Sequence, residues 1–161
     1  TGAKVEQIVQ QVRDYDSHAT LFASSVKSAR LCSKENENTF LFRYRTSSYM
    51  EYVTETRATH HRPAPGRYAV VGEMTATGSA GDLPDAATLC KGTPKGSSYM
   101  KALRSVWRYE QAADGVHVET EIAAVLGGFT LARGIVRRLL SSMMKQSLED
   151  YRTRFGQVQG G

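Results

Sequence analysis

The residues of this chain best suited to chemistry are two histidines and two glutamates. His60 and His61 adjoin at the end of one predicted strand, and Glu119 and Glu121 share one face of another. Imidazole and carboxylate groups can serve acid–base catalysis or bind a metal. Neighbouring strand residues point to opposite faces, so at most one of the histidines points inward. We find no partners that would complete a site and interpret all four as solvated. The sequence therefore predicts no catalytic residue, no metal ligand and no cofactor.

The two cysteines offer a second kind of chemistry. Cys32 and Cys90 are far apart in the sequence and form no CxxC pair. A zinc site needs several ligands at short spacing, so this pattern argues against one. We interpret both residues as free thiols and keep one disulfide as the alternative for an exported protein.

The charge pattern limits the classes of partner that the protein is expected to bind. The chain carries a formal net charge of +5, and a basic protein can bind nucleic acid or an anionic membrane. Its Lys and Arg residues are dispersed, and no basic stripe is interleaved with aromatic residues. We therefore predict no specific nucleic-acid partner and leave a transient membrane contact open. Nucleophile elbow, phosphate-loop and HExxH motifs are all absent from the sequence.

Hydrophobic spacing indicates which elements hold these residues. The 161 residues, 40% hydrophobic and 23% charged, are typical of a single globular domain, 1–161. Apolar residues at helical steps predict helices from Lys4 to Tyr15 and from Ser17 to Phe22. Alternating residues predict strands over 25–33, 39–46, 50–60, 67–77, 100–111 and 116–125.

The last predicted element is one long amphipathic helix from Phe129 to Phe155. Its inner residues recur at three- and four-residue steps, which is typical of one buried stripe: Ala132, Ile135, Val136, Leu139, Leu140, Met143, Ser147, Tyr151 and Phe155. Methionine suits adaptable pockets and irregular cores alike. A sheet closed by such a helix suggests a container for a small molecule.

Two segments fall outside the predicted elements. Residues 78–98 are rich in Gly, Pro, Ser and Ala, which indicates a long mobile connection that is either a lid over the container or a disordered loop. Residues 156–161 form a polar tail. The chain begins at Thr1 without an initiator Met, which we interpret as a trimmed or processed start. The sequence therefore assigns no compartment.

The order of these elements resembles the START-like superfamily, also called the SRPBCC or polyketide-cyclase and lipid-transport group. The resemblance lies in VEQIVQQVRDYDSHATLFASSVKSARL, in SVWRYEQAADGVHVETEI and in the terminal helix. It implies an α+β helix-grip fold, in which a curved antiparallel sheet wraps around the long C-terminal helix with an apolar cavity between them. Members of the group also have a strand before the first helix, which this chain starts too late to contain in full. Gly127 and Gly128 stand where the group often has a proline.

The expected cavity suggests a binding function. Its predicted lining comes from the strands and the long helix: Phe40, Phe42, Tyr44, Tyr52, Thr54, Leu103, Trp107, Tyr109, Val118, Ile122, Ile135, Leu139, Met143 and Tyr151. Apolar walls with a few hydroxyl groups are typical of small-molecule sites. We expect non-covalent binding of a lipid, quinone or polyketide-like aromatic. A cyclase or dehydratase in the same cavity, and a protein-interaction module with a basic surface, are the alternatives.

Overall fold

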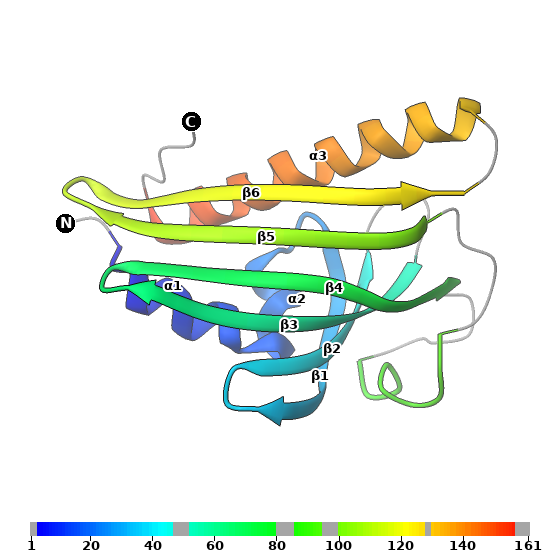
Figure 1. Cartoon of the computed structure of the whole chain (residues 1–161), viewed down its shortest axis with the longest axis horizontal. Helices are drawn as coiled ribbons and strands as arrows, with labels where there is room; N and C mark the ends of the chain where they lie inside the picture. Colours follow the sequence, from blue (N-terminus) through cyan, green and yellow to red (C-terminus); the bar gives the residue numbers. More distant parts are fainter. Residues whose placement is uncertain (1–2, 47–51, 80–85, 95–99, 128–129, 157–161) are drawn as a thin grey trace.

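The computed structural model describes residues 3–46, 52–79, 86–94, 100–127 and 130–156. Helix α1 (Val5–Arg13) leads into two short turns, η1 (Tyr15–Ser17) and α2 (His18–Leu21). Six strands follow: β1 (Val26–Asn36), β2 (Thr39–Thr46), β3 (Tyr52–Ala64), β4 (Arg67–Ser79), β5 (Met100–Ala112) and β6 (Gly115–Leu126). Helix α3 (Thr130–Phe155) comes last (Figure 1). The predicted elements are all present, with boundaries shifted by a few residues.

The six strands form one antiparallel sheet in the order β1-β2-β3-β4-β5-β6. Each strand pairs with its neighbours in the chain, and the curved sheet leaves β1 and β6 as its two edges within the described residues. Helices α1, α2 and α3 lie on the same side of this sheet (Figure 1). The predicted α+β architecture of a curved sheet with a long C-terminal helix is thereby confirmed, and the described residues ahead of α1 form no strand.

Strand alternation gives the sheet two different faces. Phe42 of β2 lies opposite Thr56 of β3 in the register, and both face the helices. We call this the inner face. The next residue along β2, Arg43, lies opposite Glu55 and belongs to the outer face. The alternation that predicted strands from the sequence therefore also separates a mostly apolar face from a charged one.

The hydrophobic core lies between the inner face and the helices. Helix α1 contributes a stripe at helical spacing, Val5, Ile8, Val9 and Val12, and Ile8 is completely buried. Tyr15 of η1 joins the same core. Full burial of an aliphatic side chain stabilises the fold by about 1.5–3 kcal/mol, so this short helix is held mainly by its packing.

Helix α3 is packed along only part of its length. Ser147 and Tyr151, in its second half, are buried against the core. Ile135, in the first half, is 57% exposed, and Leu139 is half-buried. The predicted burial of Ile135 is wrong. The first half of α3 extends beyond the part of the sheet that the second half covers (Figure 1). The predicted positions of Ala132 and Val136 lie outside the described side chains. No described helix has the length and apolarity needed to cross a bilayer.

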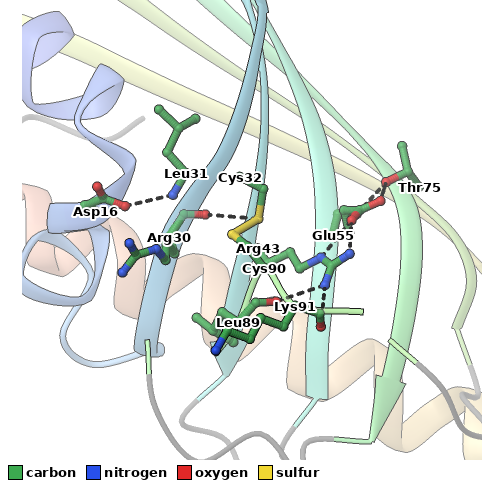
Figure 2. Close-up of a disulfide and its surroundings, with 10 residues drawn as sticks. All are labelled: Asp16, Arg30, Leu31, Cys32, Arg43, Glu55, Thr75, Leu89, Cys90 and Lys91. Atoms are coloured by element: carbon green, nitrogen blue, oxygen red, sulfur yellow. Dashed lines mark hydrogen bonds and ion pairs between the residues drawn. A yellow bond between two sulfur atoms is a disulfide. The ribbon is translucent and has the colours of Figure 1, made fainter. Parts of the chain in front are cut away.

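A second, smaller cluster lies on the outer face of the sheet. Leu89, from the connection between β4 and β5, is completely buried against Val53 of β3. Figure 2 shows that Cys90 forms a disulfide with Cys32 of β1. The interpretation of the cysteines as free thiols is therefore wrong, and the alternative of one disulfide is confirmed. The described residues 86–94 lie on the outer face, so they do not cover the inner face as a lid.

The disulfide lies beside a buried ion pair. The Arg43 guanidinium donates to Glu55 over 2.7 Å and to the Leu89 carbonyl over 2.9 Å (Figure 2). Thr75 donates a further hydrogen bond to Glu55. These hydrogen bonds lower the pKa of Glu55, against the opposing effect of its burial. Arg43 thus forms an ion pair with Glu55 of β3 and donates a hydrogen bond to the backbone carbonyl of Leu89. These two interactions explain how the buried charge of Arg43 is tolerated.

Candidate functional site

The candidate site is a cavity of about 160 Å³ between the inner face and the helices. Its helical wall consists of Val12, Tyr15, His18, Phe22, Met143, Met144, Ser147 and Tyr151. The sheet and the start of β1 supply Ser25, Val26, Phe42, Tyr44, Thr56, Ala58, Val70, Gly72, Met74, Leu103, Ser105, Trp107, Tyr109 and Ile122. Most of these side chains are aromatic or aliphatic, so the space offers apolar contact with few polar groups.

The structure divides the predicted lining residues into two groups. Those that line the cavity are Phe42, Tyr44, Leu103, Trp107, Tyr109, Ile122, Met143 and Tyr151. Those that do not are Phe40, Tyr52, Thr54, Val118, Ile135 and Leu139.

The residues of the second group lie away from the cavity for four different physical reasons. Phe40 and Val118 are buried in the filled core next to the cavity. Thr54 is buried beside the Tyr44 hydroxyl, with which it hydrogen-bonds. Tyr52 lies at the start of β3, and the half-buried Leu139 and the exposed Ile135 belong to the half of α3 that is not packed on the core. Strand alternation identifies a face, but it does not identify which part of that face is already filled.

Two tyrosines mark the boundary between core and cavity. Tyr109 of β5 and Tyr151 of α3 are both almost completely buried, and their hydroxyl oxygens are 2.7 Å apart. Burial raises the pKa of both phenols, and that of Tyr109 lies well above its usual value. Both therefore remain neutral and hydrogen-bonded to each other, which ties α3 to the sheet beside the cavity.

A buried histidine with two tyrosine partners lies in the core beyond the cavity. Nε2 of His60 is 2.5 Å from the Tyr15 hydroxyl, and Nδ1 hydrogen-bonds with the Tyr68 hydroxyl. His60 is 4% exposed, so its interpretation as a solvated strand end is wrong. His61 is exposed, as the alternation requires. In the sequence, alternation allowed at most one inward ring, and the partners that would have identified it are distant along the chain or lie on another strand.

This histidine is held in its neutral form. Burial, together with the positive charge of Arg13, lowers the pKa of His60 to about 3. In the neutral ring one nitrogen donates to a tyrosine oxygen while the other accepts a tyrosine proton. Burial also raises the pKa of Tyr15 and Tyr68. Both nitrogens of His60 are thus used within the core.

His18 is the histidine that lines the cavity. It is 7% exposed, and its ring packs among Tyr15, Phe22 and Phe42 at centroid distances of 4.7, 5.3 and 5.7 Å. Nε2 donates to the carbonyl oxygen of Val12 over 2.8 Å. Burial lowers the pKa of His18 to about 4, so the ring is neutral near pH 7. Sequence reasoning missed this residue because it lies on a helical turn, away from the strand patterns.

Hydroxyl groups supply the remaining polarity of the cavity wall. Tyr44 hydrogen-bonds with Thr54 and Thr56, and the hydroxyls of Ser25 and Ser147 are 3.1 Å apart. Ser105 lies next to Gly72 on β4: a Cβ atom on Gly72 would come within 2.7 Å of the Ser105 oxygen. The glycine therefore leaves the space that the serine hydroxyl occupies on the floor of the cavity.

The other candidates from the sequence are on the outer face. Glu119 and Glu121 are exposed and form ion pairs with Arg108 at 3.6 and 3.3 Å. Their interpretation as a solvated face is confirmed. Within the described ranges, no three His, Cys, Asp or Glu side chains come close enough together to hold a metal ion. The cavity is therefore the best candidate site in the described part of the chain.

Comparison with known proteins adds no family to this description. No protein-family model matches the sequence, and no curated protein matches it either.

Proposed function

We propose that this protein binds a hydrophobic small molecule non-covalently in the cavity between the sheet and α3. The unfilled volume of about 160 Å³ beside a filled core carries this proposal. Protein interiors are close-packed and leave few voids larger than a water molecule. Enclosed apolar cavities of this size bind benzene-sized molecules, and the cavity here is partly open with mostly apolar walls. Membership of the START-like group, which the sequence suggested, is part of the same proposal, and the sheet-and-helix arrangement supports it.

The size of the cavity suggests the size of its ligand. A volume of about 160 Å³ accommodates roughly one aromatic ring with small substituents. Burial of such a ligand would contribute about 25 cal/mol per Å² of apolar surface before the costs of association. Among the molecules suggested by the sequence, a small quinone or aromatic fits inside. A lipid chain would have to extend beyond the cavity.

The protonation states of the buried groups support binding over catalysis. A general acid or base works best when its pKa lies near the operating pH. Burial moves the pKa of His18 and His60 to about 4 and about 3, and raises that of Tyr15. These shifts stabilise neutral, hydrogen-bonded groups. Such groups suit a container better than a cyclase or dehydratase.

A fluorescence titration tests the proposal. Trp107 is the single tryptophan of the chain and lines the cavity. We expect toluene to change its emission saturably. Ser105→Leu would fill the cavity from its floor and should abolish the change. Arg104→Leu adds a leucine at the neighbouring position on β5, which faces outward, and should leave the change intact.

Two results would contradict this proposal. The first is a flat response of the wild-type emission to toluene. The second is an unchanged response in Ser105→Leu, which would place the toluene elsewhere. Native mass spectrometry of freshly purified protein would complement the titration by revealing any small molecule that remains bound.

A further inference from the structure

We infer that the cavity selects a small aromatic molecule that carries a hydroxyl group, and that Nδ1 of His18 accepts the hydrogen bond from this hydroxyl. This inference rests on the proposed function and names its ligand class. It is carried by the geometry of one ring: His18 lines the cavity, one of its nitrogens is fixed by the backbone, and the other has no partner in the described residues.

The tautomer of His18 follows from its contact with α1. A carbonyl oxygen can only accept, so Nε2, 2.8 Å from the Val12 oxygen, must carry the ring proton. Nδ1 of the neutral ring then has a lone pair and no hydrogen. It acts as an acceptor alone, whereas a hydroxyl group both donates and accepts.

The surroundings of Nδ1 indicate whether a ligand can reach it. Within the described ranges, the ring of His18 makes its hydrogen bond to Val12 through Nε2, and no hydrogen bond reaches Nδ1. Some described side chains, such as Thr77 and Thr120, have a polar atom that is fully buried and has no hydrogen-bond partner. Nδ1 of His18 is not among these fully buried atoms. Since the ring lines the cavity and is only 7% exposed overall, we infer that a molecule in the cavity reaches this nitrogen.

The other polar groups of the wall are less selective. The hydroxyls of Tyr109 and Tyr151 bond each other, and so do those of Ser25 and Ser147. The Ser105 hydroxyl can turn to donate or accept, so it discriminates against neither donors nor acceptors. Trp107 also lines the cavity, and its indole N–H can only donate. Among the acceptors of the wall, His18 is therefore the group that sets a requirement, and the requirement is a donor.

The surroundings of His18 define the rest of the ligand. Its ring lies among Tyr15, Phe22 and Phe42, so a hydroxyl bound there would have an aromatic environment around it. Flat aromatic ligands would gain stacking or edge contacts in this environment. A site that hydrogen-bonds a ligand hydroxyl rejects the analogue without it, because the buried acceptor is then left unpaired. The chemistry that fits is a phenol or a small aromatic alcohol.

A pair of matched ligands tests this inference. Para-cresol and para-fluorotoluene have nearly the same shape, and only the cresol can donate. Their dissociation constants would be measured by NMR titration of the wild type and two variants. In His18→Gln the amide takes the place of Nε2 and keeps the Val12 contact, but nothing replaces Nδ1. In His18→Asn the amide oxygen takes the place of Nδ1.

We expect the two variants to behave differently. His18→Gln should shift the ratio of the two dissociation constants by about tenfold against cresol, because its hydroxyl would be buried without an acceptor. His18→Asn should keep most of the wild-type ratio. His61→Gln, an exposed histidine on β3, is the matched control and should leave the ratio unchanged.

The outcomes separate the two proposals. If neither compound binds the wild type, the proposed function and the inference both fail. If both bind and the ratio is the same in His18→Gln, the container stands and the role of His18 is wrong. Should the variants not fold, the ¹⁵N signal of Nδ1 in the wild type decides. It should move with cresol and not with para-fluorotoluene, and equal shifts would overturn the inference.

Discussion

The inner face of the sheet has two parts that differ in how completely the helices fill them. In one part, Ile8 of α1 packs in the core beneath the sheet and has no exposed surface. In the other part, Phe42 and Leu103 face a cavity that Met143 only partly covers. Both parts are rich in aromatic and aliphatic residues. The composition of the strands therefore does not determine whether a region becomes core or container; the helix residue opposite does.

The largest effect should come from the filled part. Ile8→Ala removes a completely buried side chain and should lower the free energy of unfolding by about 2–5 kcal/mol. Gln10→Ala, on the exposed side of the same helix, should change it by no more than about 0.5 kcal/mol. Urea denaturation would measure both. Similar losses in the two variants would show that α1 does not pack as described.

Acid should destabilise the filled part through its neutral histidine. The pKa of His60 is about 3 in the folded protein and about 6.5 in an unfolded chain, so the unfolded state binds more protons between these values. Stability therefore falls as the pH decreases below about 6.5, approaching 1.4 kcal/mol per pH unit for this residue. His18, with a pKa of about 4, adds a similar slope in that range.

His60→Gln isolates this contribution. The variant should be less stable at pH 7 because the tyrosine hydrogen bonds change, and it should lose roughly half of the histidine-dependent slope between pH 6 and 5. Urea denaturation at several pH values would measure it. A slope equal to that of the wild type would mean that His60 is not buried in its neutral form.

A substitution in the cavity part should change ligand binding more than it changes the free energy of unfolding. Met143→Ala enlarges the cavity at a half-buried position, so we expect a loss of only about 1–2 kcal/mol. The enlarged space should favour naphthalene over toluene relative to the wild type, which Trp107 emission can report. An unchanged preference together with a loss above about 3 kcal/mol would reassign Met143 to the filled core.

The smallest effect should come from the first half of α3. Leu139 is half-buried and does not line the cavity, so Leu139→Ala should cost about 1 kcal/mol or less. Arg138→Ala, at an exposed position next to it, should cost nothing measurable. Chemical denaturation of both variants would test this. A loss of several kcal/mol for Leu139 would indicate that the helix is packed over its whole length.

Local patterns were enough to predict most of the fold. Alternation placed Phe42 on the inner face of β2, and Trp107 and Tyr109 on the inner face of β5. This pattern depends only on neighbouring residues, and the structure confirms it. The long C-terminal helix was predicted for the same reason, since its apolar period persists over many turns.

Long-range relations were not predictable in the same way. The stripe of α3 includes Ile135 and Tyr151 at equivalent spacing, but the first is 57% exposed and the second is completely buried. Periodicity describes a face of the helix and not how far the sheet extends beneath it. The hydrogen bond of His60 with Tyr15 likewise joins residues 45 positions apart in the sequence.

The disulfide has a consequence for how the chain responds to cleavage. Cys32 and Cys90 are 58 positions apart, and their bond closes β2, β3 and β4 into one covalent ring. A protease that cuts one peptide bond inside this ring would release no fragment until a reductant was added. On a non-reducing gel the nicked protein would keep its full mass. A cut after Lys91 lies outside the ring and would leave two pieces with no covalent bond between them. The pairing of β4 with β5 and the packing of α1 and α2 against β5 and α3 would hold these pieces together.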